Sequence, residues 1–270
     1  MEVNMLAGRI KHETVEIDAE GAKQVVVNIE FGAGEIQLTS GDINSVIKGD
    51  ITYDTRTIDF ICEYEINNGV GNLLLESSHR KKGHIDTEEN KWDVMLSQKY
   101  PMRLDMEIGA CDAEMDLGGL RLEELSLDVG AAAAELDFSN PNPIRLKDID
   151  IEAGAASLEM RNVGNANFES FDFSGGVGSF DLDLRGEYDG ESKVTIDVGL
   201  GSMDLILPRN VPVKIITEGN NWLSSIKFHH NNLNEVDGNI YESPDFDKAE
   251  TRIIVEIKIG LGSIDLYWKR

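Results

Sequence analysis

"GLGSMDL" occupies Gly199–Leu205, and the similar heptapeptides "GLGSIDL" and "GVGSFDL" occupy Gly260–Leu266 and Gly176–Leu182. A glycine-rich stretch of this kind either holds a phosphate or turns the chain at a corner. A dinucleotide fingerprint needs a third glycine where Asp204 stands, followed by a helix, whereas an alternating apolar pattern follows here. The calcium-binding nonapeptide of β-rolls fits no better, because Phe180 takes its aspartate position. The heptapeptide therefore predicts a structural corner.

The corner recurs along most of the chain at a nearly regular period. Spacings between the central copies are 21 to 24 residues, and longer gaps separate the outer ones. Such a period is typical of a repeat architecture with insertions towards both ends. Eight copies can be aligned on their opening glycine: Gly32, Gly69, Gly109, Gly130, Gly154, Gly176, Gly199 and Gly260.

Each copy has the pattern strand, corner, strand. In "LSLDVGAAAAELDF", apolar and polar residues alternate before and after Gly130, which is the period of a half-buried strand. The inward-facing set changes parity between Val129 and Ala134, so a straight strand would turn its apolar side chains outward. A bend at the glycine resolves this conflict.

These patterns predict an all-β fold, a right-handed β-solenoid with rungs of about 22 residues. A β-sandwich is the alternative, since it also has short strands at even spacing. We expect residues 1–100 to form a region of irregular rungs with insertions and residues 101–270 to form the regular repeats, both within one continuous solenoid. An insertion at about 208–251 is expected to form a hairpin or degenerate rung around Gly219. We expect the eight glycines to stack along one edge. The expected core of the best-defined rung is Ile196, Val198, Met203 and Leu205.

Composition excludes some classes of partner. Fifty Asp and Glu residues against 25 Lys and Arg give a formal net charge of −25, which argues against nucleic acid and against an anionic membrane surface. The sequence contains no apolar stretch of membrane-spanning length and no visible signal peptide. The chain is therefore expected to be either cytoplasmic or a mature form without its leader. Cys62 and Cys111 lie in apolar alternation and are expected to be buried free thiols.

Three stretches together resemble the bacterial toast-rack family: "ETVEIDAEGAKQVVVNIEFGAGEIQLTSGD" (Glu13–Asp42), "NKWDVMLSQKYPMRLDMEIGACDAEMDLGGLRLEELSLDVGA" (Asn90–Ala131) and the closing "GLGSIDL". Relatives of that family are LiaF-type cell-wall-active-antibiotic response proteins and a group of adhesins. The resemblance covers nearly the whole chain. It implies an extended β-solenoid on the outer face of a bacterial membrane, with a role in envelope-stress signalling or adhesion. An extracytoplasmic, envelope-associated location follows as an expectation.

No catalytic residue and no cofactor site is predicted. The common motifs of hydrolases, zinc proteases and redox enzymes are absent from the sequence. The main hypothesis is accordingly a non-enzymatic envelope scaffold, sensing or interaction module. An enzyme with its site in the insertion, using His229, His230 and Asp237, is kept as an alternative.

Carboxylates recur at two fixed positions of the repeat. Five of the eight copies carry one two residues before the glycine, and six carry one five residues after it. Both positions alternate with core residues, so stacked rungs would align them at about 5 Å, where like charges repel. The columns predict either a solvated acidic face or a ladder for Ca²⁺ or a cationic partner, as in a calcium-dependent adhesin. The candidate metal ligands are Glu114, Glu135, Glu159, Asp181, Asp204 and Asp265.

The end of the chain bears on association. "GLGSIDLYWKR" stops at Arg270, shortly after the last corner, and a terminal rung exposes unpaired backbone groups. We expect either the insertion after Pro208 to cover that edge or an earlier strand to pair with it. The negative charge opposes self-association. A monomer or weak dimer is therefore predicted, with a protein or a cationic envelope component as partner.

Overall fold

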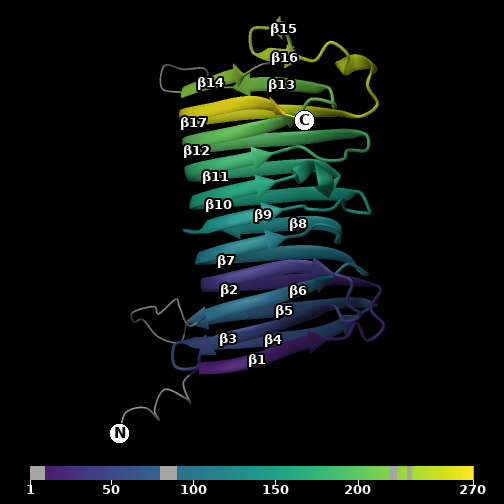
Figure 1. The fold of residues 1–270 in the computed structure, drawn as a ribbon, viewed down its shortest axis with the longest axis vertical. Coiled ribbons are helices and arrows are strands. Elements are labelled where there is room, and N and C mark those ends of the chain that lie inside the picture. Colours follow the sequence, from purple (N-terminus) through teal and green to yellow (C-terminus); the bar gives the residue numbers. More distant parts are fainter. Residues whose placement is uncertain (1–9, 80–89, 219–223, 230–232, 270) are drawn as a thin grey trace.

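The protein is an elongated stack of strands, described here from a computed structural model covering residues 10–79, 90–218, 224–229 and 233–269. A single sheet of 17 strands runs from one end to the other (Figure 1). The two helical turns among the described residues are short 3₁₀ segments, η2 (Val163–Ala166) and η3 (Phe246–Lys248). The all-β prediction is confirmed.

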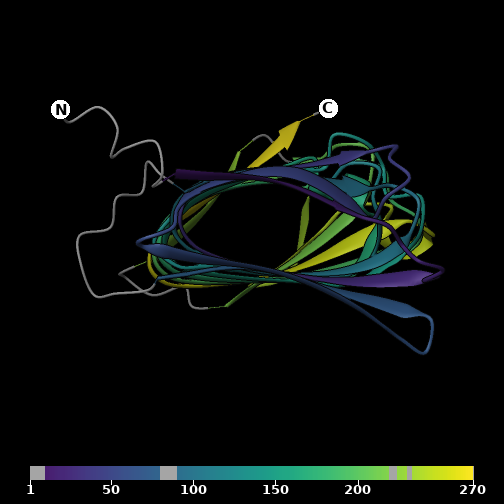
Figure 2. The same ribbon diagram turned by 90° about the horizontal axis from the view of Figure 1, so that it is seen from below.

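The repeating unit is a long strand that bends once and so contributes to both broad sides of a flattened oval (Figure 2). The long strands are β2 (Gln24–Gly41), β7 (Pro101–Asp116), β10 (Leu146–Arg161), β11 (Phe168–Asp183), β12 (Glu191–Pro208) and β17 (Arg252–Lys269). In one rung the bend separates two strands, β8 (Arg121–Val129) and β9 (Ala133–Asp137).

Successive rungs pair in parallel and in register. Leu146 of β10 lies opposite Phe168 of β11, and Ser170 lies opposite Lys193 of β12. The partners are 22 and 23 residues apart in the chain, which matches the sequence period. Parallel pairing of consecutive repeats is the arrangement of a solenoid and not of a β-sandwich built from antiparallel hairpins. The right-handed coil stays a prediction.

Seven of the eight glycines stack along one edge, which we call the glycine edge. A Cβ on Gly109 would lie 2.2 Å from the Gly32 carbonyl oxygen, and one on Gly260 would lie 2.5 Å from that of Gly199. The six stacked glycines after Gly32 each approach the backbone of the preceding rung in this way, so a side chain would separate the rungs. The stacked positions are Gly32, Gly109, Gly130, Gly154, Gly176, Gly199 and Gly260.

The prediction that Gly69 forms an eighth corner is wrong. Asn68 and Gly69 have φ of 54° and 83°, and they connect β4 (Ile58–Asn67) to β5 (Val70–His79) as an antiparallel hairpin. An Asn-Gly pair between two alternating runs is a strong signal for a two-residue hairpin turn. In this rung β5 pairs with the first half of β2 and β6 (Asn90–Ser97) with the second half, and residues 80–89 between them lie outside the described residues.

The core lies between the two broad sides and continues from rung to rung. Ile196, Val198, Met203 and Leu205 are all at most 1% exposed, as predicted. Ile196 is flanked by Phe173 on β11 and Ile257 on β17, and every long strand supplies the same inward positions. Burial of one continuous apolar column is the main favourable term in the stability of such a stack.

Asparagine side chains connect the rungs at the opposite edge, where the chain returns to start the next strand. The Asn142 side chain donates hydrogen bonds to the carbonyl oxygens of Leu122 and Ala166, at 2.9 and 3.2 Å, in the rungs on either side. Asn165 donates to the Phe138 carbonyl in the same manner. Asn142 is buried, so these bonds satisfy backbone groups that water cannot reach.

The insertion covers the last strand, as expected. β17 lies between β12 on one side and β13 (Val213–Glu218) and β14 (Ser224–His229) on the other. β13 and β14 form one further parallel rung, and the hairpin β15 (Asn234–Asp237) with β16 (Ile240–Glu242) pairs onto β13. Gly219, on which the extra rung was expected to centre, lies outside the described residues.

The other end is covered by antiparallel strands. β5 and β6 pair in parallel with the two halves of β2, and β4 and β3 (Ile47–Asp54) pair antiparallel to them. β1 (Ile10–Ile17) then pairs with β3. The same sheet passes through the region before residue 100 and the region after it. The division into those two regions stays a prediction.

Replacement of Gly201 by alanine should destabilise the stack strongly. Gly201 has φ +149°, and its Cβ would lie 2.0 Å from the carbonyl oxygen of Gly178 in the preceding rung. We expect a loss of about 2 kcal/mol or more in the free energy of unfolding, measured by urea titration. Gly238→Ala is the matched control, because a Cβ there meets nothing within 4 Å. Equal stabilities of the two variants would contradict the proposed role of close rung spacing.

Candidate functional site

The carboxylates that follow the glycine edge form one column across the broad side of the solenoid. The register pairs Glu114 with Glu135, Glu135 with Glu159, and Asp181 with both Glu159 and Asp204. Gln37 and Asp93 extend the column at one end, and Asp265 and Lys227 extend it at the other. All six predicted metal-ligand candidates therefore stand side by side. We call this set the aspartate–glutamate column.

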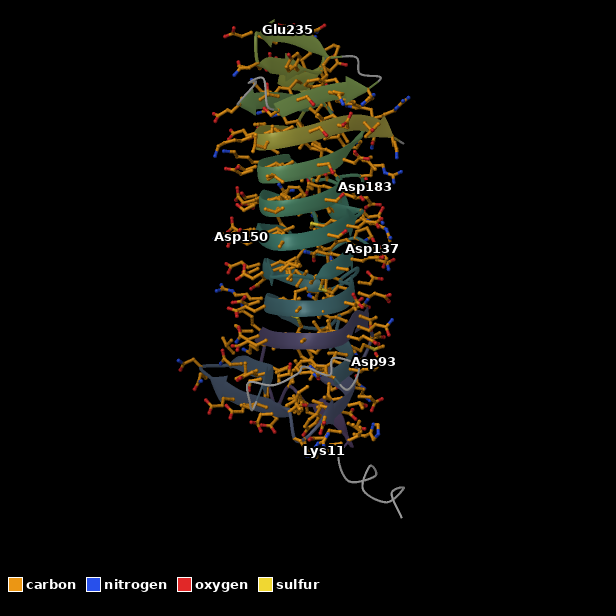
Figure 3. The ribbon with its side chains drawn as sticks, turned by 90° about the vertical axis from the view of Figure 1, so that its left-hand side faces the viewer. Lys11, Asp93, Asp137, Asp150, Asp183 and Glu235 are labelled. Carbon is orange, nitrogen blue, oxygen red and sulfur yellow. The ribbon has the colours of Figure 1, made fainter. Side chains whose placement is uncertain are left out.

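A second column precedes the glycine edge, on the opposite broad side. Figure 3 looks onto the glycine edge and shows acidic side chains on both flanks, with Asp150 on one side and Asp137 and Asp183 on the other. The register places the members of the second column in consecutive rungs: Glu76, Glu30, Glu107, Asp128, Glu152, Ser174, Asp197, Lys258 and Glu218.

Basic side chains neutralise only parts of the aspartate–glutamate column. Arg161 reaches both Glu135 and Glu159, at 2.9 and 2.6 Å. His229 Nε2 lies 2.7 Å from Asp265, and Lys227 also approaches that carboxylate, at 3.8 Å. No basic side chain in the described part of the chain forms an ion pair with Glu114, Asp181 or Asp204. The middle of the column therefore retains unpaired negative charge.

Burial and neighbouring like charges shift the titration of two outward carboxylates: Asp181 of the aspartate–glutamate column, and Asp150, which stands two residues before Glu152 and belongs to neither column. Partial burial and the charges of Asp204 and Glu159 raise the pKa of Asp181 above its ordinary value. Burial, together with Asp172 and Asp128, raises the pKa of Asp150. Both shifts have the sign expected where like charges stand in adjacent strands.

The six carboxylates do not converge on one point, and their assignment as metal ligands stays a prediction. Among the described residues, no three His, Cys, Asp or Glu side chains are grouped so that they could hold one ion. Calcium takes six to eight oxygen ligands around one point, whereas these carboxylates are spread one per rung. The structure brings the six candidates into a line and gives them no common centre.

Of the three residues of the alternative enzymatic site, His229 and Asp237 are described, and no hydrogen bond joins them. His229, at the end of β14, hydrogen-bonds Asp265 and stacks on Tyr267, with ring centroids 4.7 Å apart. Asp237 is exposed on β15, and His230 lies outside the described residues. Sequence reasoning did not anticipate that the partner of His229 would be a member of the acidic column.

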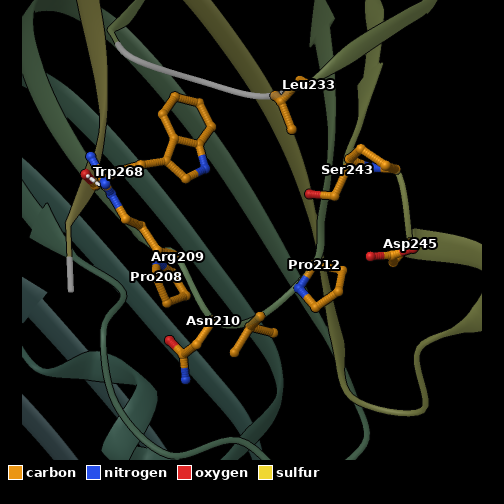
Figure 4. A pocket seen from close by; sticks show the side chains of 10 residues that line it. Pro208, Arg209, Asn210, Pro212, Leu233, Ser243, Asp245 and Trp268 are labelled. Atoms are coloured by element: carbon orange, nitrogen blue, oxygen red, sulfur yellow. Dashed lines mark hydrogen bonds between the residues drawn. The ribbon is translucent and has the colours of Figure 1, made fainter.

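An open cavity of about 750 Å³ lies at the C-terminal end of the stack (Figure 4). It is bordered by the β12–β13 connection, the segment after β16 and Trp268. Arg209 and Asp245 are the charged groups on its rim, and Arg209 donates from Nε to the Trp268 carbonyl oxygen at 3.0 Å. Neither His229 nor Asp237 lines this cavity.

Both cysteines are free thiols, as predicted. Cys111 is buried at the glycine edge, and burial raises its pKa to about 11. Cys62, half-buried on β4, has a raised pKa for the same reason. Both thiols therefore stay protonated at neutral pH and are poor nucleophiles.

A sequence family and several solved structures match the chain. Residues 6–161 match the family described as the N-terminal domain of toast_rack, DUF2154. No curated protein matches. In the part of the chain that the structure describes, none of the helical segments has the length and apolar character to cross a membrane.

The structural similarity extends over the full length. A "putative cell adhesion protein" from Clostridium sporogenes is 23% identical, with a TM-score of 0.52, and the match covers 97% of this chain and 100% of that one. A "putative adhesin" from Bacteroides fragilis is 11% identical, with a TM-score of 0.38 and coverage of 96% and 97%. The first of these similarities supports the fold.

Asp181→Asn should stabilise the protein at neutral pH. The raised pKa means that the folded state holds its proton more tightly than the unfolded state, so ionised Asp181 carries a penalty above its folded pKa. We expect a gain of about 0.5 kcal/mol at pH 7 in low salt. The gain should shrink as the pH falls through the folded pKa and vanish below the ordinary value of 3.8.

Urea unfolding at several pH values checks this expectation. Glu187→Gln is the control, since that carboxylate lies in the β11–β12 connection outside both columns. A gain that is independent of pH, or equal in the control, would show that repulsion in the column is not its cause.

Proposed function

We propose that this chain, which belongs to the toast-rack family, is a non-enzymatic interaction module of the bacterial cell envelope that presents its acidic face to a cationic partner. The observation that carries the proposal is the alignment of outward carboxylates in register. Glu114, Asp181 and Asp204 among them have no ion-pair partner within the described residues. An extracytoplasmic location and a role as scaffold or sensor are part of the proposal, as is a monomeric or weakly dimeric state.

Aligned charges on a rigid support act together. Neighbouring rungs place carboxylates about 4.8 Å apart, well within the roughly 10 Å screening length at moderate ionic strength. Their potentials therefore add, and a surface of one sign attracts opposite charge and accelerates encounter. A bound cationic group would offset the repulsion between Asp181 and the neighbouring charges of Asp204 and Glu159. The register aligns equivalent positions whatever residue they carry, but a purely solubilising face does not require a carboxylate at the same position of six repeats.

The geometry gives less support to the other two hypotheses. A calcium-dependent adhesin needs grouped oxygen ligands, and the described residues provide none of the groupings that could hold an ion. An enzyme in the insertion needs convergent groups, whereas the nearest partner of His229 is Asp265 of the acidic column. The acidic interaction surface is therefore preferred.

Decalysine should bind to the protein at low ionic strength, and added salt should weaken the binding. The triple variant Glu114→Gln/Asp181→Asn/Asp204→Asn should lower the affinity about fivefold to tenfold, since each lost contact is worth a few tenths of a kcal/mol. Isothermal titration calorimetry measures both effects. The matched control, Glu187→Gln/Asp189→Asn/Asp247→Asn, removes the same total charge from exposed positions outside the column.

Equal losses in the two triple variants would mean that net charge alone attracts the probe, and the proposal would be wrong. Binding of decalysine that requires Ca²⁺ and disappears with a chelator would favour the adhesin hypothesis instead.

A further inference from the structure

An apolar ridge runs along the glycine edge in three consecutive rungs. The residue after the corner glycine is Val177 in β11, Leu200 in β12 and Leu261 in β17, and the register places the three side by side. They are 53%, 46% and 41% exposed. Six large apolar side chains are exposed among the described residues, and half of them stand in this one ridge. Such clustering marks an interaction site more often than scattered exposure does.

The fold itself does not require these large side chains. The equivalent residues of the neighbouring rungs are Ala110, Ala131 and Ala155, and their corners stack in the same way. A large aliphatic side chain that points outward at this position exposes more apolar surface to water than an alanine does, which is unfavourable. The ridge is therefore a property of three rungs only, where it is added to a corner that forms without it.

Polar columns accompany the ridge on the same broad side. Two residues further along each strand come Ser179, Ser202 and Ser263, and two further come Asp181, Asp204 and Asp265, all paired in register. The three heptapeptides that define the corner therefore also contribute three parallel columns of side chains: one aliphatic, one of serine hydroxyls and one of aspartates.

The unpaired charge of the acidic column coincides with the ridge. Below it, Arg161 neutralises Glu159, and above it, Lys227 and His229 lie on Asp265. Asp181 and Asp204, between these two groups, have no basic partner among the described residues. The surface therefore combines exposed aliphatic groups with uncompensated negative charge in the same rungs.

The spacing of the columns fits a helix lying along the stack. Four residues of fully extended strand span at most about 13 Å from the ridge to the aspartates, and the bend beside the ridge shortens this towards the 10–12 Å diameter of an α-helix with its side chains. Rungs repeat at about 4.8 Å and helical turns at 5.4 Å, so the two stay nearly in step across three rungs. A helix over the serines would place one flank on the ridge and the other on the aspartates.

We propose that Val177, Leu200 and Leu261, with Asp181 and Asp204, form a docking surface for a basic amphipathic helix of a partner protein or peptide. This inference rests on the proposed function and specifies its partner. The aliphatic stripe of the helix contacts the ridge, and its Lys or Arg stripe pairs with the aspartates. A second copy of this chain is a poorer occupant, because it would bring two acidic surfaces together.

The test uses a fluorescently labelled 14-residue peptide of Leu and Lys, arranged as an amphipathic helix, and the full chain. Fluorescence anisotropy should show tighter binding of this peptide than of a scrambled peptide with the same composition. Leu200→Ser/Leu261→Ser should weaken binding about tenfold, and Asp181→Asn/Asp204→Asn by a similar factor. Circular dichroism and thermal melting establish that each variant folds.

Two matched controls separate this surface from the rest of the molecule. Ala131→Ser/Ala155→Ser adds hydroxyls on the same edge but leaves the ridge intact. Glu107→Gln/Asp128→Asn removes the same charge from the second column. Among the described residues these two carboxylates form no ion pair, whereas Asp197 of the same column pairs with Lys258. Both controls should change the affinity by less than about twofold.

Equal binding of the scrambled peptide, or wild-type affinity in the ridge variant, would overturn the ridge as a docking surface. If decalysine still bound through the acidic column, the proposed function would stand without it, whereas loss of both would remove both. Ridge-dependent binding to neutral phosphatidylcholine vesicles, or a ridge-dependent dimer in sedimentation, would also replace the helix by another occupant.

Discussion

The close approach of backbones at the glycine edge is the constraint on which the rest of the structure depends. At the stacked corners a Cβ would lie between 2.2 and 3.2 Å from the carbonyl oxygen of the preceding rung. The absence of a side chain there lets each strand bend and still pair in register on both broad sides. Once that register is fixed, equivalent residues of every repeat must stand in columns. The apolar core, the serine row and the acidic columns are all consequences of it.

Because equivalent residues stand in columns, each side chain interacts with copies of its own type in the neighbouring rungs. For apolar residues the effect is favourable, since Ile196 meets Phe173 and Ile257 in neighbouring rungs and all three are buried. For carboxylates it is unfavourable: burial together with the charges of Asp204 and Glu159 raises the pKa of Asp181. Arg161, Lys258 and His229 relieve that cost locally. Asp181 and Asp204 have no such basic neighbour among the described residues. Their carboxylates nevertheless stay in adjacent rungs, because packing of the core fixes the register of the strands.

The sequence predicted those parts of the fold that repetition determines, and it failed where a single element departs from the repeat. The inward set and the acidic column follow from counting residues from each glycine. The position of Gly69 in the alignment of repeats led to its prediction as a corner. The Asn68–Gly69 pair is, however, a local signal for a hairpin turn, which the alignment of repeats did not take into account. In the chain, the insertion with β13 to β16 lies between β12 and β17, yet in the sheet β17 pairs directly with β12. Several strands offer similar pairing edges, so tertiary packing decides which one β17 joins. No local pattern encodes it.

The candidate site shows the same division. Its carboxylates could be found from the sequence, but their pairing could not, because Arg161 and His229 belong to different positions of the repeat. The ridge was visible in the letters "GVGS" and "GLGS" and was attributed entirely to the corner. Only exposure distinguishes the two roles: the glycines serve the backbone approach, whereas Val177, Leu200 and Leu261 point away from it. One heptapeptide can thus specify a fold through its glycines and a surface through the residues between them.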